Sequence, residues 1–105
     1  MIVQEQIDEI TQKIVKNFQP QKIILFGSYA YGAPTEESDL DLMIIKDSDL
    51  PGRLQNREIR KLLSGSKIPV DVIVKTPHEF EVYKDIIGTI VYPAHKFGKV
   101  LYEER

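Results

Sequence analysis

The sequence of 105 residues contains no cysteine and no tryptophan, and no apolar stretch in it is longer than a few residues. Without cysteine the chain can form neither disulfides nor thiolate metal sites, which suits a reducing cytoplasm. A membrane-spanning helix needs about 20 apolar residues. The first residues also lack the basic start and long apolar core of a signal peptide. We therefore expect a cytoplasmic protein that does not associate with membranes.

Charge and length set further limits. The formal net charge is −2, so no overall electrostatic attraction to nucleic acid is expected. A chain of this length corresponds to one domain and buries roughly 60–70% of its unfolded surface, which is enough for a modest core. We expect a single domain over residues 1–105, without internal repeats, linkers or low-complexity segments.

The most informative part of the sequence lies within residues 23–45. An apolar run there ends in Gly27 and Ser28, a short linker follows, and a second apolar run opens with Asp39 and Asp41. Residues two apart on a strand point to the same face, so the two carboxylates are expected to project together. Adjacent like charges repel unless a cation lies between them. Mg²⁺ suits such a place, because it takes oxygen ligands and shares its coordination shell with phosphates.

A third carboxylate, Asp71, lies inside the β-branched run 67–74. If that strand lies beside the one that begins at Asp39, the three acids form a group typical of two-metal sites for phosphoryl or nucleotidyl transfer. Gly27 and Ser28 can bind the phosphates that such a site needs, because glycine lets backbone N–H groups approach a phosphate and helix N-termini favour anions. Alone, Asp-x-Asp or Gly-Ser usually marks an ordinary turn or strand end, so the prediction depends on their combination.

The segments 27–32, 38–42 and 71–72 together resemble the signature of the minimal nucleotidyltransferases, which are short members of the DNA polymerase beta-like nucleotidyltransferase superfamily. Members of that family are often antitoxins encoded beside a partner protein with a HEPN fold. Some of them transfer AMP from ATP to a tyrosine of that partner. The resemblance extends from about residue 23 to the tail at 99–103.

The resemblance implies a role for each residue of the motif. Gly27 and Ser28 would contact the nucleotide phosphates. Asp39 and Asp41 would hold Mg²⁺, and Asp71 would be the third carboxylate that completes the catalytic and metal site. These five residues are the candidate site.

One position departs from the family pattern. Many relatives have arginine where this sequence has Tyr31, so a cationic contact to the triphosphate is either missing or supplied elsewhere. Three of the four arginines, Arg53, Arg57 and Arg60, fall near one face of an expected helix, with Lys61 beside them. That face is either plain solvated surface or a patch for triphosphate or for an acidic partner.

The periodicity of apolar residues predicts an α+β fold, a small mixed β-sheet with helices packed against it. Phe80, Tyr83 and Ile87 are expected to form the buried stripe of a helix opened by Thr76 and Pro77. The expected elements begin with a helix, with an apolar stripe from Val3 to Phe18, that ends at Pro20, followed by a strand at 21–26, a short helix at 29–32 and a strand at 39–45. A helix at 53–63, with Leu54, Ile59, Leu62 and Leu63 inward, and a strand at 70–74 come next. After the helix opened by Thr76 we expect helical turns within 88–97, with a break or start near Pro93, and a final or dimer-edge strand at 99–103.

The sequence therefore predicts a Mg²⁺-dependent nucleotidyltransferase that transfers AMP from ATP to a hydroxyl and releases pyrophosphate. A chain this short has little left to form an acceptor pocket, so the acceptor is expected on another protein, which the resemblance makes a HEPN-type toxin. The main alternative is a non-catalytic antitoxin that neutralises the toxin by covering it. A transferase acting on a small molecule is a further alternative, but such enzymes generally need an additional substrate domain. The sequence leaves open the acceptor residue, the nucleotide preference, and whether the chain forms a homo-oligomer or a hetero-oligomer with the toxin.

Overall fold

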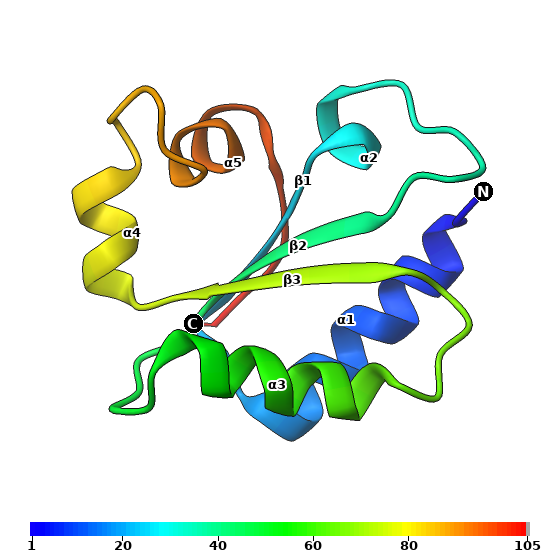
Figure 1. Ribbon diagram of the computed structural model, residues 1–105, viewed down its shortest axis with the longest axis horizontal. Helices are drawn as coiled ribbons and strands as arrows, with labels where there is room; N and C mark the ends of the chain where they lie inside the picture. The colour runs from blue at the N-terminus through cyan, green and yellow to red at the C-terminus, as the bar shows by residue number, and fades with distance from the viewer. Residues whose placement is uncertain (105) are drawn as a thin grey trace.

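The computed structural model describes residues 1–104, within which four strands form one sheet with helices on both faces (Figure 1). The elements in chain order are α1 (Gln4–Phe18), β1 (Lys22–Phe26), α2 (Ser28–Tyr31), β2 (Leu40–Ile45), α3 (Gly52–Leu63), β3 (Val70–Lys75), α4 (Pro77–Tyr83), α5 (Val91–Phe97) and β4 (Lys99–Glu103). The strand order is β3-β2-β1-β4. Strand β1 runs antiparallel to β2 and β4, and β2 runs parallel to β3. The expected α+β fold with a mixed sheet is confirmed.

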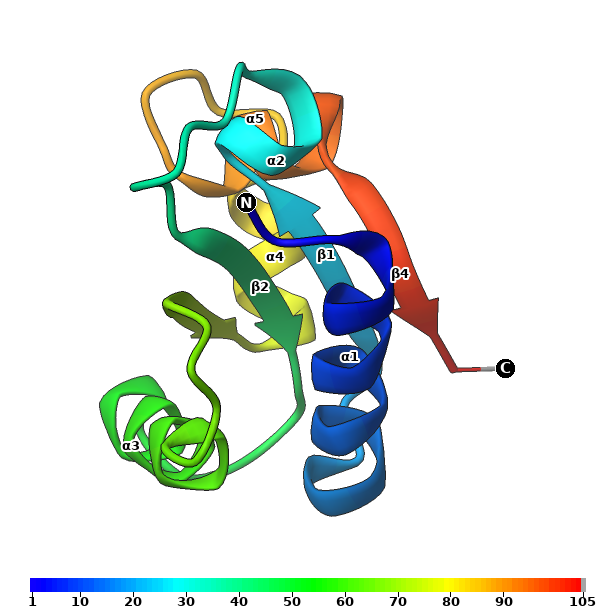
Figure 2. The same cartoon turned by 90° about the vertical axis from the view of Figure 1, so that its right-hand side faces the viewer.

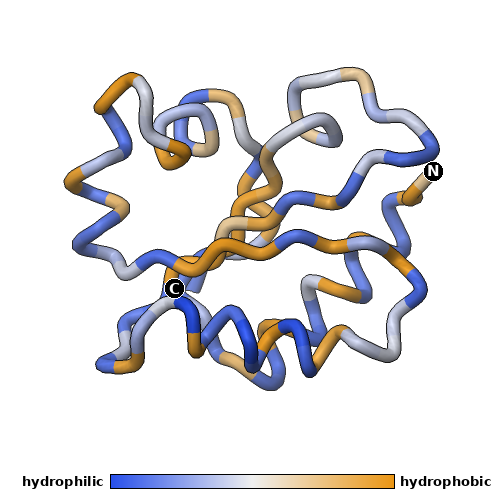
Figure 3. Tube along the Cα trace, viewed as in Figure 1, coloured by the Kyte–Doolittle hydropathy of each residue, from blue (hydrophilic) through white to orange (hydrophobic). Residues whose placement is uncertain are grey.

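Alternation along the strands divides the core into two layers. On β1, Ile23 and Leu25 pack with α1 and α3, whereas Ile24 and Phe26 pack with α4 and α5. Strands buried on both faces consist of near-continuous apolar residues, which explains the apolar runs at β1 and β2. Figure 3 shows apolar residues along these central strands, and Figure 2 shows β4 at one edge of the sheet. Among the described helices, none has both the length and the apolar character that crossing a membrane requires.

Helix α1 has the apolar face that its periodicity predicts. Ile7 and Ile14 are buried, whereas Val3 lies before the first turn and is exposed. The helix ends where Gln19 adopts a left-handed conformation, at φ 50°, immediately before Pro20. Proline is common just after a helix because it cannot continue the hydrogen-bonding pattern, so this end follows from the sequence.

Helix α3 packs beside β3, the strand at the other edge of the sheet. Ile59 and Leu63 are buried as expected, whereas Leu54 and Leu62, also expected to point inward, are only partly buried. Gln55 is buried instead, and its side-chain amide donates to the backbone carbonyl of Leu50 at 3.0 Å. Residues four apart share one face of a helix, so the inward face of α3 is centred on Gln55 and Ile59.

The helix expected after Thr76 is shorter than the apolar pattern predicts. Helix α4 begins as expected, with Thr76 as its side-chain cap, but it ends at Tyr83. Of the three residues expected to be buried, only Phe80 is, whereas Tyr83 is 42% exposed and Ile87 is 80% exposed. The predicted buried stripe is therefore wrong. A helical period in sequence requires a helical backbone, and the chain leaves the helix before Gly88, which has a positive φ of 99°.

The last helix and strand agree with the sequence. Pro93 lies in the first turn of α5, where its missing N–H removes no helical hydrogen bond. Gly98 ends α5, and β4 follows directly and pairs with β1. A Cβ atom at Gly98 would overlap the carbonyl oxygen of Ala94 and would lie 2.7 Å from Ile24 Cγ2 and 2.8 Å from the carbonyl oxygen of Leu25. The junction of α5 and β4 therefore requires glycine.

This close approach gives a test of the fold. Gly98→Ala should lower the free energy of unfolding by roughly 1–3 kcal/mol, as overpacking in a core typically does. Gly65→Ala is the matched control, because a Cβ at Gly65 meets nothing within 4 Å. Urea denaturation of both variants measures the difference. Equal midpoints for the two variants would show that the junction is not tightly packed.

Candidate active site

Two of the candidate acids are brought together by strand pairing. Strands β2 and β3 are parallel and in a register that places Asp41 opposite Asp71. Leu40 and Leu42, on either side of Asp41, pack in the layer of α1 and α3. Because side chains alternate along a strand, Asp41 and Asp71 both point to the other face, on the side of α4 and α5. Asp39 directly precedes β2, which begins one residue later than expected.

The three carboxylates interact electrostatically. Burial raises the pKa of the Asp41 carboxyl above its ordinary value, and the negative charges of Asp71 and then Asp39 raise the pKa further. Asp41 is partly buried, whereas Asp39 and Asp71 are exposed. The structure thus brings the three predicted acids into one group whose members repel one another.

Gly27 lies directly against this group. It forms the turn between β1 and α2 at φ 73°, a left-handed conformation that favours glycine. A Cβ atom at Gly27 would overlap the carboxylate oxygen Oδ2 of Asp41. The closeness follows from the register of β1 and β2, in which Phe26 is opposite Asp41. The Gly27–Ser28 turn and the acids therefore belong to one site, although this contact is not evident from the sequence.

The third acid has a cationic partner. Arg60 Nη2 on α3 lies 3.6 Å from Asp71 Oδ1, and the side chains of Arg60 and Asp71 are 64% and 51% exposed. Within residues 1–104, neither Arg53 nor Arg57 forms an ion pair. The predicted arginine face is therefore divided, and only Arg60 reaches the candidate site. The sequence predicts only that Arg60 is one of three arginines near one face of a helix. The packing of α3 against β3 distinguishes it from the other two.

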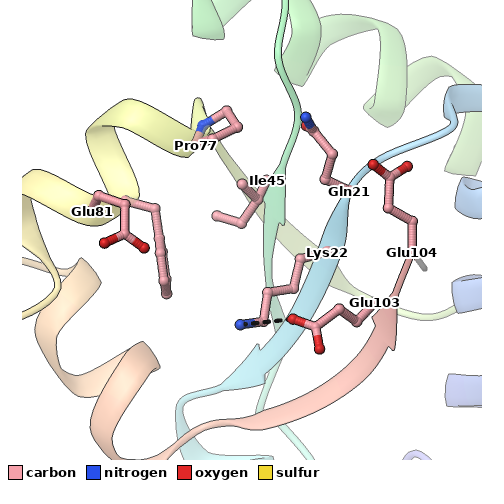
Figure 4. Close-up of a pocket in the computed structure, with 8 residues that line it drawn as sticks. Gln21, Lys22, Ile45, Pro77, Glu81, Glu103 and Glu104 are labelled. Atoms are coloured by element: carbon pink, nitrogen blue, oxygen red, sulfur yellow. Dashed lines mark ion pairs between the residues drawn. The ribbon is translucent and has the colours of Figure 1, made fainter.

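The structure also has a pocket whose lining residues differ from the predicted site residues. It has a volume of about 340 Å³ and lies at the Ile45 end of β2, which is the end farther from Asp41 (Figure 4). Its lining contains Lys22, whose Nζ lies 3.3 Å from Glu103 Oε2. It also contains Glu81 and Glu104, which would repel phosphate. None of the five predicted site residues lines this pocket, so we do not assign the nucleotide to it.

Residues 7–94 match the family described as "Nucleotidyltransferase domain", and this span contains all five predicted site residues. The chain belongs to the nucleotidyltransferase domain family. The predictions of the family and of the enzyme class, a nucleotidyltransferase, are confirmed.

The relatives of this nucleotidyltransferase include archaeal proteins. A putative protein adenylyltransferase of Methanocaldococcus jannaschii is 38% identical over 82 residues, which are 78% of each chain. The protein adenylyltransferase MntA of Thermococcus cleftensis is 26% identical over 97 residues, which are 88% of this chain and 97% of that one.

Two solved structures share the fold. One is a mutant of the toxin–antitoxin pair MntA–HpeT, and the other is a toxin–antitoxin with AMP-PNP. Each has a TM-score of 0.64 and 22% sequence identity and covers 93% of this chain, which corresponds to 73% and 74% of the respective solved chains.

The acids of this nucleotidyltransferase fit a divalent cation in chemistry but do not form a closed site. Carboxylate oxygens are the ligands that hard divalent cations prefer, and a cation between the acids would relieve the repulsion that raises the pKa of Asp41. Within residues 1–104, however, no three histidine, cysteine, aspartate or glutamate side chains are arranged to hold a metal ion. Asp71, which the sequence-based prediction assigns to the cation site, is engaged by Arg60.

The nucleotidyltransferase has an aromatic contact at the position that departs from the family pattern. The Tyr31 ring lies edge-on to the Phe97 ring of α5, with 5.8 Å between ring centroids. Both side chains remain substantially exposed, at 45% for Tyr31 and 57% for Phe97. Tyr31 therefore connects α2 to α5 and does not supply the cation of the family pattern.

The raised pKa of Asp41 predicts how stability depends on pH without divalent cations. The native protein binds the Asp41 proton more tightly than the unfolded chain does. Stability should therefore fall as the pH rises from the ordinary carboxyl pKa through the raised one. Asp41→Asn should melt a few degrees higher than the wild type at pH 7 in EDTA, and the difference should disappear below the ordinary carboxyl pKa. Asp49→Asn, which removes an exposed acid from the loop after β2, is the control. Equal effects of both substitutions would contradict the repulsion at Asp41.

Proposed function

We propose that this nucleotidyltransferase transfers AMP from ATP to a tyrosine hydroxyl of a partner toxin with a HEPN fold, uses Mg²⁺, and so acts as the antitoxin of that toxin. The observation that carries the proposal is the in-register pairing of Asp41 and Asp71 beside the Gly27 turn. Relatives named protein adenylyltransferase support the transfer of AMP. The solved proteins of the same fold support a toxin as partner and ATP as nucleotide, because they are toxin–antitoxin structures and one contains AMP-PNP.

In this proposal four of the five site residues bind the nucleotide and its cation, and Asp71 also acts on the acceptor hydroxyl. Gly27 and Ser28 would hold the β- and γ-phosphates, and Asp39 and Asp41 would hold the cation. Bound Mg²⁺ would neutralise charge on the phosphates and on the leaving pyrophosphate. Asp71 completes the cation site and accepts the proton of the acceptor hydroxyl.

The transfer itself exchanges one phosphorus–oxygen bond for another. The tyrosine oxygen attacks the α-phosphorus of ATP in line with the oxygen that bridges to the β-phosphate. The new bond joins AMP to the tyrosine, the bond to the bridging oxygen breaks, and pyrophosphate leaves. The hydroxyl proton passes to the carboxylate of Asp71. The exposed position of Asp71 supports this role, because an acceptor on another protein must reach it from solvent.

The alternative function is neutralisation of the toxin by binding alone. The observation that favours it is the aromatic pair of Tyr31 and Phe97 in place of a cation near the nucleotide turn. The group of three acids argues against it, because mutually repelling carboxylates are unfavourable in a protein that has no use for them.

As the place of action we propose the cytoplasm, because a chain without cysteine suits a reducing compartment.

The first experiment tests the nucleotide and the cation. Mg²⁺ with ATP should raise the melting temperature of the wild type, because a ligand at a hundredfold excess over its Kd stabilises the native state by about 2.7 kcal/mol. The double variant Asp39→Asn/Asp41→Asn should lose this rise, and Asp49→Asn should keep it. Differential scanning fluorimetry with Mg²⁺ alone, ATP alone and both together measures the effect. An equal rise in the wild type and the double variant would remove Asp39 and Asp41 from the cation site.

The second experiment tests the transfer. Incubated with ATP, Mg²⁺ and its partner toxin, the wild type should add one or more AMP units to the toxin, which intact mass spectrometry detects. Asp71→Asn should retain much of the affinity for Mg²⁺ with ATP but transfer AMP at least about a hundredfold more slowly, because general-base groups typically contribute 10²–10⁴-fold in rate. Neutralisation of the toxin by the Asp39→Asn/Asp41→Asn variant, without any added mass, would instead establish the alternative function.

A further inference from the structure

Of the three acids in the candidate site, only Asp71 has a cationic partner among residues 1–104. That partner is Arg60, whose Nη2 lies 3.6 Å from Asp71 Oδ1. Asp41 has no ion pair within this part of the chain and lies between the Gly27 turn and Asp71. The positive charge nearest to the group of acids is therefore attached to the one acid that lies on the edge strand.

The position of Arg60 is fixed by the preceding helical turn. Asn56 Oδ1 accepts a hydrogen bond from the backbone N–H of Val74 at 3.1 Å, which anchors α3 to the open edge of β3. Residues four apart lie on the same face of a helix, so Arg60 extends from the same face as Asn56. The helix runs opposite to the strand, because Asn56 meets Val74 while Arg60 meets the earlier Asp71. The packing of α3 therefore brings Arg60 within reach of Asp71.

This ion pair competes with a shared cation for the same carboxylate. Within residues 1–104 no three acids are arranged to hold an ion, and Asp71 is the one of the three candidate acids that Arg60 engages. Arg60 also places a positive charge beside the carboxylate that the cation would share. A solvent-exposed ion pair of this kind changes an equilibrium by no more than about fivefold, so a divalent cation can displace it.

We infer that Arg60 is a positioning residue, which holds Asp71 until a divalent cation replaces the guanidinium as the partner of that carboxylate. The inference rests on the proposed function, because it takes the three acids to be a cation site. It adds that the site is completed only when the ion pair opens. Before this exchange the charge of Arg60 offsets the charge of Asp71, which lies beside Asp41. After the exchange Asp71 shares the cation with Asp39 and Asp41.

The test measures binding of Mn²⁺ alone, without nucleotide, at low ionic strength where charges are least screened. Arg60→Gln should bind Mn²⁺ about two- to fivefold more tightly than the wild type, because the competitor for Asp71 is gone. Arg60→Lys, which keeps the charge, should stay near the wild type. Arg57→Gln is the matched control, since it removes the same charge from an exposed position one turn earlier on the same helix. Titration calorimetry or the electron paramagnetic resonance signal of free Mn²⁺ gives each Kd.

A double-mutant cycle separates the exchange from a general effect of charge. In the Asp71→Asn background, Arg60→Gln should no longer change the affinity for Mn²⁺. The inference is overturned if Arg60→Gln and Arg57→Gln have equal effects, if the effect persists without Asp71, or if no variant binds Mn²⁺. These outcomes are distinct from failure of the proposed function, which is decided by the transfer of AMP in the presence of Mg²⁺ and ATP.

Discussion

The parallel pairing of β2 with β3 is the constraint on which the candidate site depends. It places Asp41 opposite Asp71, and the alternation of side chains sends both carboxylates to one face of the sheet while their apolar neighbours fill the other. A shift of this register by one residue would turn Asp71 toward the apolar layer of α1 and α3. The apolar residues of β3 therefore do more than stabilise the sheet, because the burial of Val72 and Val74 also fixes where the third carboxylate lies.

Much of this arrangement could be predicted from the sequence because it depends on local patterns. The apolar run that opens at Asp39 and the β-branched run at 70–74 mark two strands, and acids two residues apart at the start of a strand share a face. The strands at β1 and β2 are apolar on both faces, which requires helices on both sides and so a layered α+β fold. The strand order β3-β2-β1-β4 does not follow from such patterns.

The errors and omissions have a common physical cause, which is that tertiary contacts decide them. The apolar pattern continues through Ile87, but the chain leaves the helix at Tyr83 and exposes that residue. The close approach of Gly27 to Asp41 depends on the register between β1 and β2, and the ion pair of Arg60 depends on the position of α3 along β3. A sequence shows which residues can make such contacts but not which of several arginines does.

The two layers on the sheet differ in the amount of apolar side-chain surface that holds them. The core of α1 and α3 consists of twelve buried residues, whereas the core of α4 and α5 consists of seven. Native proteins open locally where few buried apolar contacts hold a segment. Amide hydrogens of α4 and α5 are therefore expected to exchange with solvent sooner than those of α1 and α3. Such an opening would uncover the face of the sheet that carries the acids and would leave intact the layer that holds its strands in register.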